Sequence, residues 1–166
     1  MKFVKLYVEI IPTTMAYFDY DTIKGLLDFD CEISLTYKET AIDYFGFEYE
    51  AECHEFLTKD NHYILTTCEY DPIGILEYLE DYNKFGLNIH HVLELWEKMH
   101  FQYNFYTRMR LTDKNDTVTI NKFLQIVGVL CEITKGYVVV EHHHLTDVMD
   151  VGLYDAKLWQ DRVRYL

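Results

Sequence analysis

The sequence predicts an α+β fold, in which a mainly antiparallel sheet carries helices packed on one face. Several segments alternate apolar and polar residues with the period of two that is typical of a half-buried strand. Three of these segments follow one another with short connections, as in an antiparallel meander. Segments with helical spacing alternate with strands in the rest of the chain. Because no Pro-, Gly- or Ser-rich linker divides it, we expect residues 1–166 to form a single globular domain.

The expected order of elements is β-α-β-β-β-α-α-β-α-β-α. The first strand covers residues 2–11, where every second residue is apolar, and Pro12 ends it. A short helix follows, for which Asp19 or Asp21 is the expected N-cap. The apolar side of this helix consists of Ile23, Leu26 and Leu27.

Three alternating segments form the predicted meander: residues 31–38, 45–53 and 62–70. The last two are joined by a turn at residues 58–61, which are rich in turn formers. In the first segment, the apolar face is Cys31, Ile33, Leu35 and Tyr37. In the second segment, the apolar face is Phe45, Phe47, Tyr49, Ala51 and Cys53. The acidic face opposite it is Glu48, Glu50 and Glu52.

The second half of the chain alternates between helices and strands. Two helices are predicted between residues 71 and 99, the first beginning at Asp71-Pro72 and the second at Asn88. A strand at 101–111 leads into a long helix, which is capped within residues 113–117 and ends at Lys135-Gly136. The long helix should bury Ile120, Phe123, Leu124, Val127, Leu130 and Cys131. A last strand over 137–145 and a weak helical pattern over 154–163 complete the order. The strands on either side of the long helix could be locally parallel.

The charge is strongly negative and unevenly distributed. The chain has 28 acidic and 15 basic residues, a net charge of −13. Residues 1–85 carry 18 acidic and 6 basic residues, whereas residues 86–166 carry 10 and 9. Such a balance argues against binding to nucleic acid or to an anionic membrane surface. The absence of a long apolar run argues against a membrane span, and Lys5 and Glu9 argue against a secretory signal. We therefore expect a cytoplasmic protein with reduced, buried cysteines.

Two clusters of carboxylates are candidates for a partner-binding surface. Alternation places Glu48, Glu50 and Glu52 on one strand face, and helical spacing places Glu77, Glu80 and Asp81 on one helix face. Like charges so placed repel each other, so a basic partner would explain why they occur together. Tyr44 and Tyr82 are candidate anchors beside them, because tyrosine is enriched in protein interfaces. The alternative is an ordinary solvated surface that keeps the protein soluble.

The only local pattern that suggests metal chemistry is a run of three histidines. On a strand, His142 and His144 share a face, and Asp147 could supply a third ligand. The spacing matches no established metal motif, so we expect no metal and no cofactor. The single serine, Ser34, lies in mid-strand and no Gly-x-Ser-x-Gly turn exists. The sequence therefore favours a protein that is not an enzyme, and a small metal-dependent enzyme that uses the three candidate ligands is the alternative.

The acidic first half, the many tyrosines, the four cysteines and the lack of a catalytic motif form a whole-chain profile. This profile resembles the immunity proteins that bacteria make against polymorphic toxins. The resemblance implies a stoichiometric inhibitor that binds and neutralises a cognate, basic toxin domain, for which a nuclease is a candidate. It rests on no motif, so it transfers no functional residue. A second alternative is a phage-type acidic inhibitor that imitates the charge of DNA.

Overall fold

The structure is a computed structural model that describes residues 8–11, 19–42, 48–69, 103–109, 116–140, 149–150 and 152–164. In these parts of the chain the strands are β1 (Glu9–Ile11), β2 (Glu32–Ile42), β3 (Glu48–Leu57), β4 (His62–Glu69), β5 (Tyr103–Met109), β6 (Tyr137–Val140) and β7 (Gly152–Asp155). The helices are α1 (Tyr20–Leu26), α4 (Thr117–Ile133) and α5 (Ala156–Arg164). The two helices predicted between residues 71 and 99 lie outside the described residues, as do residues 2–7 and 141–145 of the predicted strands.

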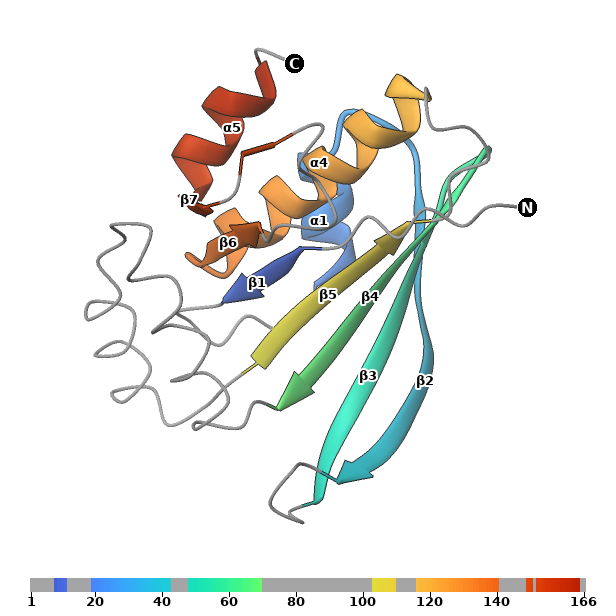
Figure 1. Cartoon of the computed structure of the whole chain (residues 1–166). Coiled ribbons are helices and arrows are strands. Elements are labelled where there is room, and N and C mark those ends of the chain that lie inside the picture. Colours follow the sequence, from blue (N-terminus) through green and yellow to red (C-terminus); the bar gives the residue numbers. More distant parts are fainter. Residues whose placement is uncertain are drawn as a thin grey trace.

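The strands form one antiparallel sheet with the order β2-β3-β4-β5-β1-β6-β7, within the described residues. All three described helices lie on the same face of this sheet (Figure 1). The α+β class, the antiparallel meander of β2, β3 and β4, and the one-sided helix layer are thus confirmed. The short strand β7, which the sequence pattern did not indicate, extends the sheet beyond β6.

The strands on either side of α4 run in the same direction, as expected, but they are not neighbours in the sheet. Both β5 and β6 pair with β1, and both pairings are antiparallel. The first described strand of the chain is therefore an interior strand between them, and Ile10 in it and Val8 just before it are buried.

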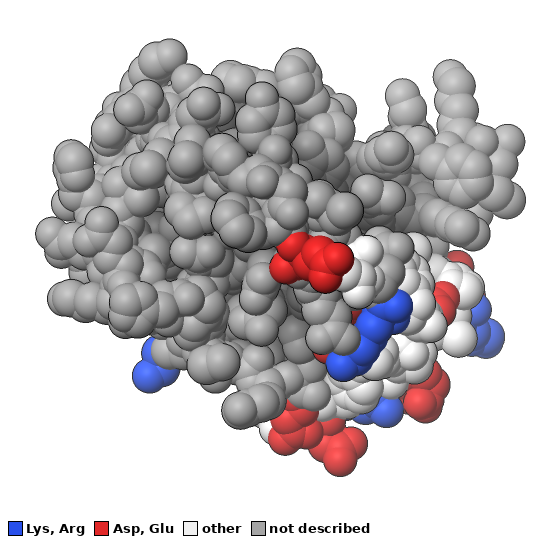
Figure 2. Space-filling view, turned by 90° about the horizontal axis from the view of Figure 1, so that it is seen from below, with Lys and Arg blue, Asp and Glu red and all other residues white. Residues whose placement is uncertain are grey.

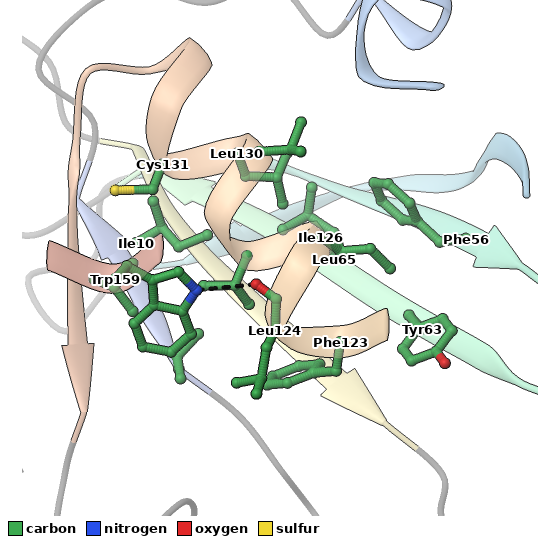
Figure 3. Close-up of a cluster of buried hydrophobic side chains, with 14 of the residues drawn as sticks. Ile10, Phe56, Tyr63, Leu65, Phe123, Leu124, Ile126, Leu130, Cys131 and Trp159 are labelled. Carbon is green, nitrogen blue, oxygen red and sulfur yellow. Dashed lines mark hydrogen bonds between the residues drawn. The ribbon is translucent and has the colours of Figure 1, made fainter. Parts of the chain in front are cut away.

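The main hydrophobic core lies between α4 and the sheet (Figure 3). Of the six side chains predicted to be buried on this helix, five are buried and Ile120 is partly buried. Ile126 and Val129 are also buried, although they lie off the predicted stripe. The reason is that α1 and α5 pack against the sides of α4 that the sheet leaves open.

The C-terminal helix is held against α4 by Trp159. Its indole Nε1 donates a hydrogen bond to the carbonyl oxygen of Leu124, 2.9 Å away (Figure 3). A Cβ atom at Gly128 would lie 3.2 Å from the Trp159 ring, so glycine permits this close approach. The ring of Tyr154 meets Trp159 edge to face, with centroids 5.6 Å apart. Tyr154 itself lies in β7, two residues before the helix begins, so the predicted start of this helix was too early.

The N-caps of α1 and α4 lie where the sequence pattern placed them. Asp19, one of the two named candidates, caps α1, and Asp116, within the predicted range 113–117, caps α4. The Asp19 side chain accepts from the backbone N–H groups of Asp21 and Thr22, and the Asp116 side chain accepts from that of Thr119. One detail of α1 was wrong, because Leu26 is 50% exposed, whereas Ile23 and Leu27 are buried. At the other end of α4, Lys135 has a left-handed φ of 47°, and Gly136 N donates to Cys131 O. This is the Schellman arrangement, with a lysine in the position that usually holds glycine.

The turn between β3 and β4 is anchored to the start of α4. It lies at residues 58–61, as predicted, and Thr58 and Asn61 are hydrogen-bonded to each other through backbone and side chain. Asn61 Nδ2 donates to Thr119 Oγ1 over 3.0 Å, and the Tyr63 hydroxyl donates to the Thr119 carbonyl over 3.2 Å. These bonds join the β3–β4 end of the meander to the start of α4.

The burial pattern of β2 differs from the prediction after Ile33. Cys31 and Ile33 are buried, but Leu35 is 42% and Tyr37 is 50% exposed. The pairing of β2 with β3 is interrupted between these last two residues by a β-bulge, which changes the face on which the following side chains lie. All side chains described between residues 34 and 40 are exposed, because this part of the hairpin extends past the helices (Figure 1).

Strand β3 has buried side chains on both of its faces. Cys53, the described member of the predicted apolar face, is buried, and Glu48 of the predicted acidic face is exposed, so these parts of the prediction are confirmed. Further along the strand, Phe56 belongs to the core cluster and His54 contacts α1, so the helix-facing residues are those that alternate with Cys53. By the same alternation, the positions of Glu48 and Glu52 lie on the helix-facing side.

Candidate functional site

The candidate site is the end of the β2–β3 hairpin that extends beyond the helices. We call this region the arm and define it as residues 37–42 of β2 and 48–53 of β3. It contains four acidic residues and one lysine. Along the helix-facing side of β3, exposure increases towards the arm. Phe56 is fully buried and His54 is 3% exposed, whereas the Glu52 side chain is 29% exposed and Glu48 is exposed.

His54 connects the arm to the first helix. Its Nδ1 atom lies 2.7 Å from the hydroxyl oxygen of Tyr20, and its Nε2 atom lies 3.1 Å from a carboxylate oxygen of Glu52. An ionised carboxylate only accepts hydrogen bonds, so Nε2 carries the proton. The Tyr20 hydroxyl then donates to Nδ1. A neutral imidazole in this one tautomer therefore satisfies both contacts.

Glu52 is also paired with the single lysine of the arm. Lys38 Nζ lies 2.9 Å from the second carboxylate oxygen, and the two residues are direct partners across the strands. The hydrogen bond from Lys38, followed by that from His54, lowers the pKa of the Glu52 carboxyl, while its partial burial opposes the shift. Glu52 therefore belongs to a series of side-chain contacts that connects β2, β3 and α1.

Burial determines the protonation state of the histidine. It lowers the pKa of His54, and the nearby Lys38 ammonium acts in the same direction, while Glu52 acts against both. Burial also raises the pKa of the Tyr20 phenol, and the Glu52 carboxylate adds to this. Both effects favour the neutral imidazole and the neutral phenol that the hydrogen-bond geometry requires.

A β-bulge lies beside this chain of contacts. His54 is paired with Leu35, and the next residue, Cys53, is paired with Tyr37 rather than Thr36. The Thr36 hydroxyl donates to the Cys53 carbonyl over 3.0 Å. Because a bulge bends and twists the strand that contains it, the hairpin changes direction where His54 contacts α1.

The opposite face of the hairpin has a different pair of titratable groups. His62 Nδ1 contacts a carboxylate oxygen of Glu55, and both side chains are partly accessible to water. Acidic and basic groups of the described residues are interspersed on the face shown in Figure 2. On this face, the carboxylates of the described residues are therefore exposed next to basic groups. Which carboxylates a partner can contact depends on where each one lies.

The structure describes only some of the residues that were predicted to bind a partner. Glu48 is exposed on the arm, Glu50 lies in β3, and Glu52 is half-buried and paired. Two sets of predicted residues lie outside the described parts of the chain. They are the partner candidates Glu77, Glu80, Asp81, Tyr44 and Tyr82, and the metal candidates His142, His144 and Asp147. The binding role of every one of these residues stays a prediction.

Sequence reasoning missed the contact between His54, Tyr20 and Glu52. The sequence contains a signal, because in Glu52-x-His54-x-Phe56 a histidine lies between a carboxylate and a large apolar residue on one strand face. That signal was hidden by the apolar alternation of residues 45–53, which pointed to the other face. The Tyr20 contact could not be read from the chain, since 34 residues separate the partners.

The cysteines that the structure describes are buried. Cys31, Cys53 and Cys131 have little accessible surface, and burial raises the pKa of the Cys131 thiol to about 12. Its Sγ atom donates to the Gly136 carbonyl over 3.1 Å. A thiol in this state is a poor nucleophile, so Cys131 serves to pack the helix.

Among the residues that the structure describes, no group of three His, Cys, Asp or Glu side chains is placed to hold a metal ion. None of the helices in the same parts of the chain is long and apolar enough to cross a membrane. The chain has no match among family models, curated proteins or solved structures.

Proposed function

We propose that this protein is a stoichiometric inhibitor that binds a basic protein domain through the arm, in the manner of the immunity proteins that it resembles. The observation that carries the proposal is the position of Glu48. It lies on the strand face that packs against the helices at its other end, yet it is exposed on the arm beyond them. A carboxylate there is accessible to a partner without displacement of any of the described helices.

The charge of the arm supports a basic partner. Four carboxylates and one lysine give it a negative potential, and the first 85 residues carry most of the negative charge of the chain. Complementary charge speeds the encounter of two proteins and excludes partners of the wrong sign. A toxin domain that acts on nucleic acid is a fitting occupant, because it presents lysines and arginines to phosphates.

Exposed apolar groups beside the carboxylates support a protein partner over a small ion. Leu35 lies at the base of the arm, is 42% exposed, and is paired with His54, which places it on the face of Glu48 and Glu52. Tyr37 is 50% exposed and is paired with Cys53 on the other face. Interfaces that bind tightly bury apolar groups at their centre and leave the charges at the rim. We therefore expect Leu35 to contribute to affinity and the carboxylates to contribute to the association rate.

The decisive experiment compares two charge reversals of equal size. The arm variant combines Glu48→Lys with Glu50→Lys. The control variant combines Asp28→Lys with Asp30→Lys, two positions before β2 whose wild-type side chains are exposed. Ten residues of β2 separate the ends of the hairpin, which is about 30 Å. Both variants have the same net charge, so they differ only in where the charge lies.

The wild-type protein is used to isolate its partner from the source organism, and association with the purified partner is then measured at low and high salt. We expect a basic domain whose activity is lost at one equivalent of inhibitor. The arm variant should associate at least about 10-fold more slowly at low salt, and the control variant should remain close to wild type. Equal slowing of both variants, or a partner without excess positive charge, would contradict the proposal.

A further inference from the structure

The two outer strands of the described sheet differ in length. Strand β7 has 4 residues and leads directly into α5, whereas β2 has 11 residues. In the described part of the chain, β3 is the only strand that pairs with β2, which forms one rim of the sheet (Figure 1). The N–H and C=O groups along the outer side of such a strand can pair with a further strand. The long edge of β2 is therefore a second feature of the hairpin, distinct from its carboxylates.

The side chains of β2 beyond the core are accessible on both faces of the sheet. All described side chains from residue 34 to residue 40 are exposed. Pairing places Leu35 beside His54 on the helix-facing side and Tyr37 beside Cys53 on the other side. An incoming strand can therefore approach this part of β2 without displacing a described helix.

Sheets block their edges with prolines, bulges, charged residues or short strands. β2 has no proline, one bulge and one lysine. The ammonium group of this residue, Lys38, contacts Glu52 on β3. The bulge separates residues 32–35 from residues 37–42, whose pairing with β3 is continuous. At about 3.3 Å per residue, the run 37–42 is about 20 Å long, which is the ordinary length of a strand.

The charge of the arm indicates which kind of strand fits this edge. On the helix-facing side, Thr40 is paired with Glu50, and Ile42 is paired with Glu48. A strand added to β2 would lie about 4.8 Å from it and about 10 Å from β3. A lysine or arginine opposite Thr40 or Ile42 can extend across these uncharged positions towards the acidic positions of β3. The arm contains four acidic residues and one lysine, so a basic segment fits this edge better than the equally acidic arm of a second copy.

We propose that the outer edge of β2 at residues 37–42 binds an extended, basic segment of the partner as an additional strand of the sheet. Main-chain hydrogen bonds contribute to affinity, and alternate lysine or arginine side chains lie towards the acidic positions of β3. This inference rests on the proposed function for the source of the segment. It specifies that the basic domain is held through the backbone of β2 in addition to the side chains of the arm.

The first test needs no partner from the source organism. The probe is a synthetic peptide of four Lys-Val repeats, which forms an extended basic strand when it is paired. One control peptide has glutamate in place of lysine, and the other has proline in place of the second and third valines, which removes two N–H donors. Binding is followed by NMR of the isotope-labelled protein.

We expect the Lys-Val peptide to give backbone-to-backbone nuclear Overhauser effects with residues 37–42 of β2. Both control peptides should bind at least about 10-fold more weakly, because one lacks hydrogen-bond donors and the other is repelled by the arm. Binding of the Lys-Val peptide elsewhere, no binding at all, or equal binding of either control would overturn the strand addition.

The second test removes one N–H group from the edge of β2. Successive N–H groups of a strand point to opposite neighbours, so only one of the adjacent residues Thr40 and Ala41 has its N–H on the outer side. Proline is tolerated only at that position. Thr40→Pro and Ala41→Pro are therefore both prepared, and the one that keeps the circular dichroism spectrum of the wild type is the edge variant. Its matched control has alanine at the same position, either Thr40→Ala or the wild-type protein.

The edge variant should bind the isolated partner and the Lys-Val peptide at least about 10-fold more weakly than its alanine control. Equal binding would overturn the strand addition. If neither proline variant folds, the peptide test decides.

The outcomes distinguish this inference from the proposed function. Slower association of the charge-reversed arm, with equal binding of the edge variant and its control, would leave the proposed function supported and the strand addition wrong. A peptide that pairs with β2, together with an isolated partner that is not basic, would support the strand addition and contradict the proposed function. Dimerisation of the wild-type protein alone through β2, measured by sedimentation, would identify a second copy as the occupant and overturn the inference.

Discussion

The two ends of β3 lie in different environments. At the end near Phe56, the helix-facing side packs into the core cluster, and the turn and strand that follow are hydrogen-bonded to Thr119 of α4. At the end near Glu48, the same side of the same strand is exposed and acidic. His54 lies between them, with a polar ring in a buried position.

This difference separates a part of the strand that stabilises the fold from a part that is available for the proposed binding. The packed end contributes stability because its apolar side chains are removed from water. The exposed end contributes little to stability, so like charges are tolerated there. Substitutions should therefore have large effects on unfolding in the packed half and small effects on the arm, with His54 in between.

The largest effect is expected at Trp159. Replacing it with alanine removes the largest fully buried side chain and its hydrogen bond to Leu124, which should lower the free energy of unfolding by about 3–5 kcal/mol. Urea unfolding followed by circular dichroism measures this change. The neighbouring Leu158→Ala, at a position that is 43% exposed, should cost less than about 1 kcal/mol. Similar losses in both variants would mean that α5 is not packed as described.

A smaller effect is expected where the β3–β4 turn meets α4. Asn61→Ala removes the side-chain hydrogen bond to Thr119 and should cost about 1–2 kcal/mol, because both partners are buried. The exposed neighbour Lys59→Ala in the same turn is the control and should stay within about 0.5 kcal/mol of wild type. The comparison would fail if the two substitutions destabilised the protein equally in thermal unfolding.

The pH dependence of stability should report on the burial of His54. Burial lowers the pKa of His54 in the folded protein, so its contribution is fully present above the ordinary histidine pKa of 6.5. That contribution is lost as the pH falls from this value through the lowered pKa. The unfolding free energy of the wild type should therefore decrease over this interval more steeply than that of His54→Gln. Parallel curves for the two proteins would show that His54 is not buried as a neutral ring.

The smallest effect on stability is expected on the arm itself. Glu48→Lys should change the unfolding free energy by less than about 0.5 kcal/mol, and the sign should be neutral or favourable because repulsion between like charges is relieved. Chemical denaturation provides the measurement. A loss of more than about 1 kcal/mol would place Glu48 in a packed environment and remove the contrast between the two ends of β3.

The long helix shows how far local sequence goes. Apolar spacing and a capping turn within residues 113–117 predicted the position of α4 and five of its buried side chains, because both signals act within a few residues of the chain. The meander was predictable for the same reason, since period-two alternation and turn residues are local. The extra burial of Ile126 was not predictable, because it depends on helices that approach from other parts of the sequence.

The site could be predicted only in part. The carboxylates of β3 were identified from their spacing, but the face that they share with His54 and Phe56 was not. Alternation with a period of two marks two faces equally well, and here Cys53 on one face and His54 on the other are both buried. Which side of β3 packs against the helices depends on the neighbouring strands and on the bulge in β2. The sequence of β3 alone therefore does not predict its helix-facing side.

The sequence by itself determined the class of fold, the capped helices, the meander and the uneven charge, because each arises from residues close together in the chain. The tertiary structure alone decided that β1 lies between β5 and β6, that Trp159 contacts Gly128, and that Tyr20 reaches His54 across 34 residues. Such pairings form because surfaces from distant segments are buried together. A pattern along the sequence does not show which of these surfaces come into contact.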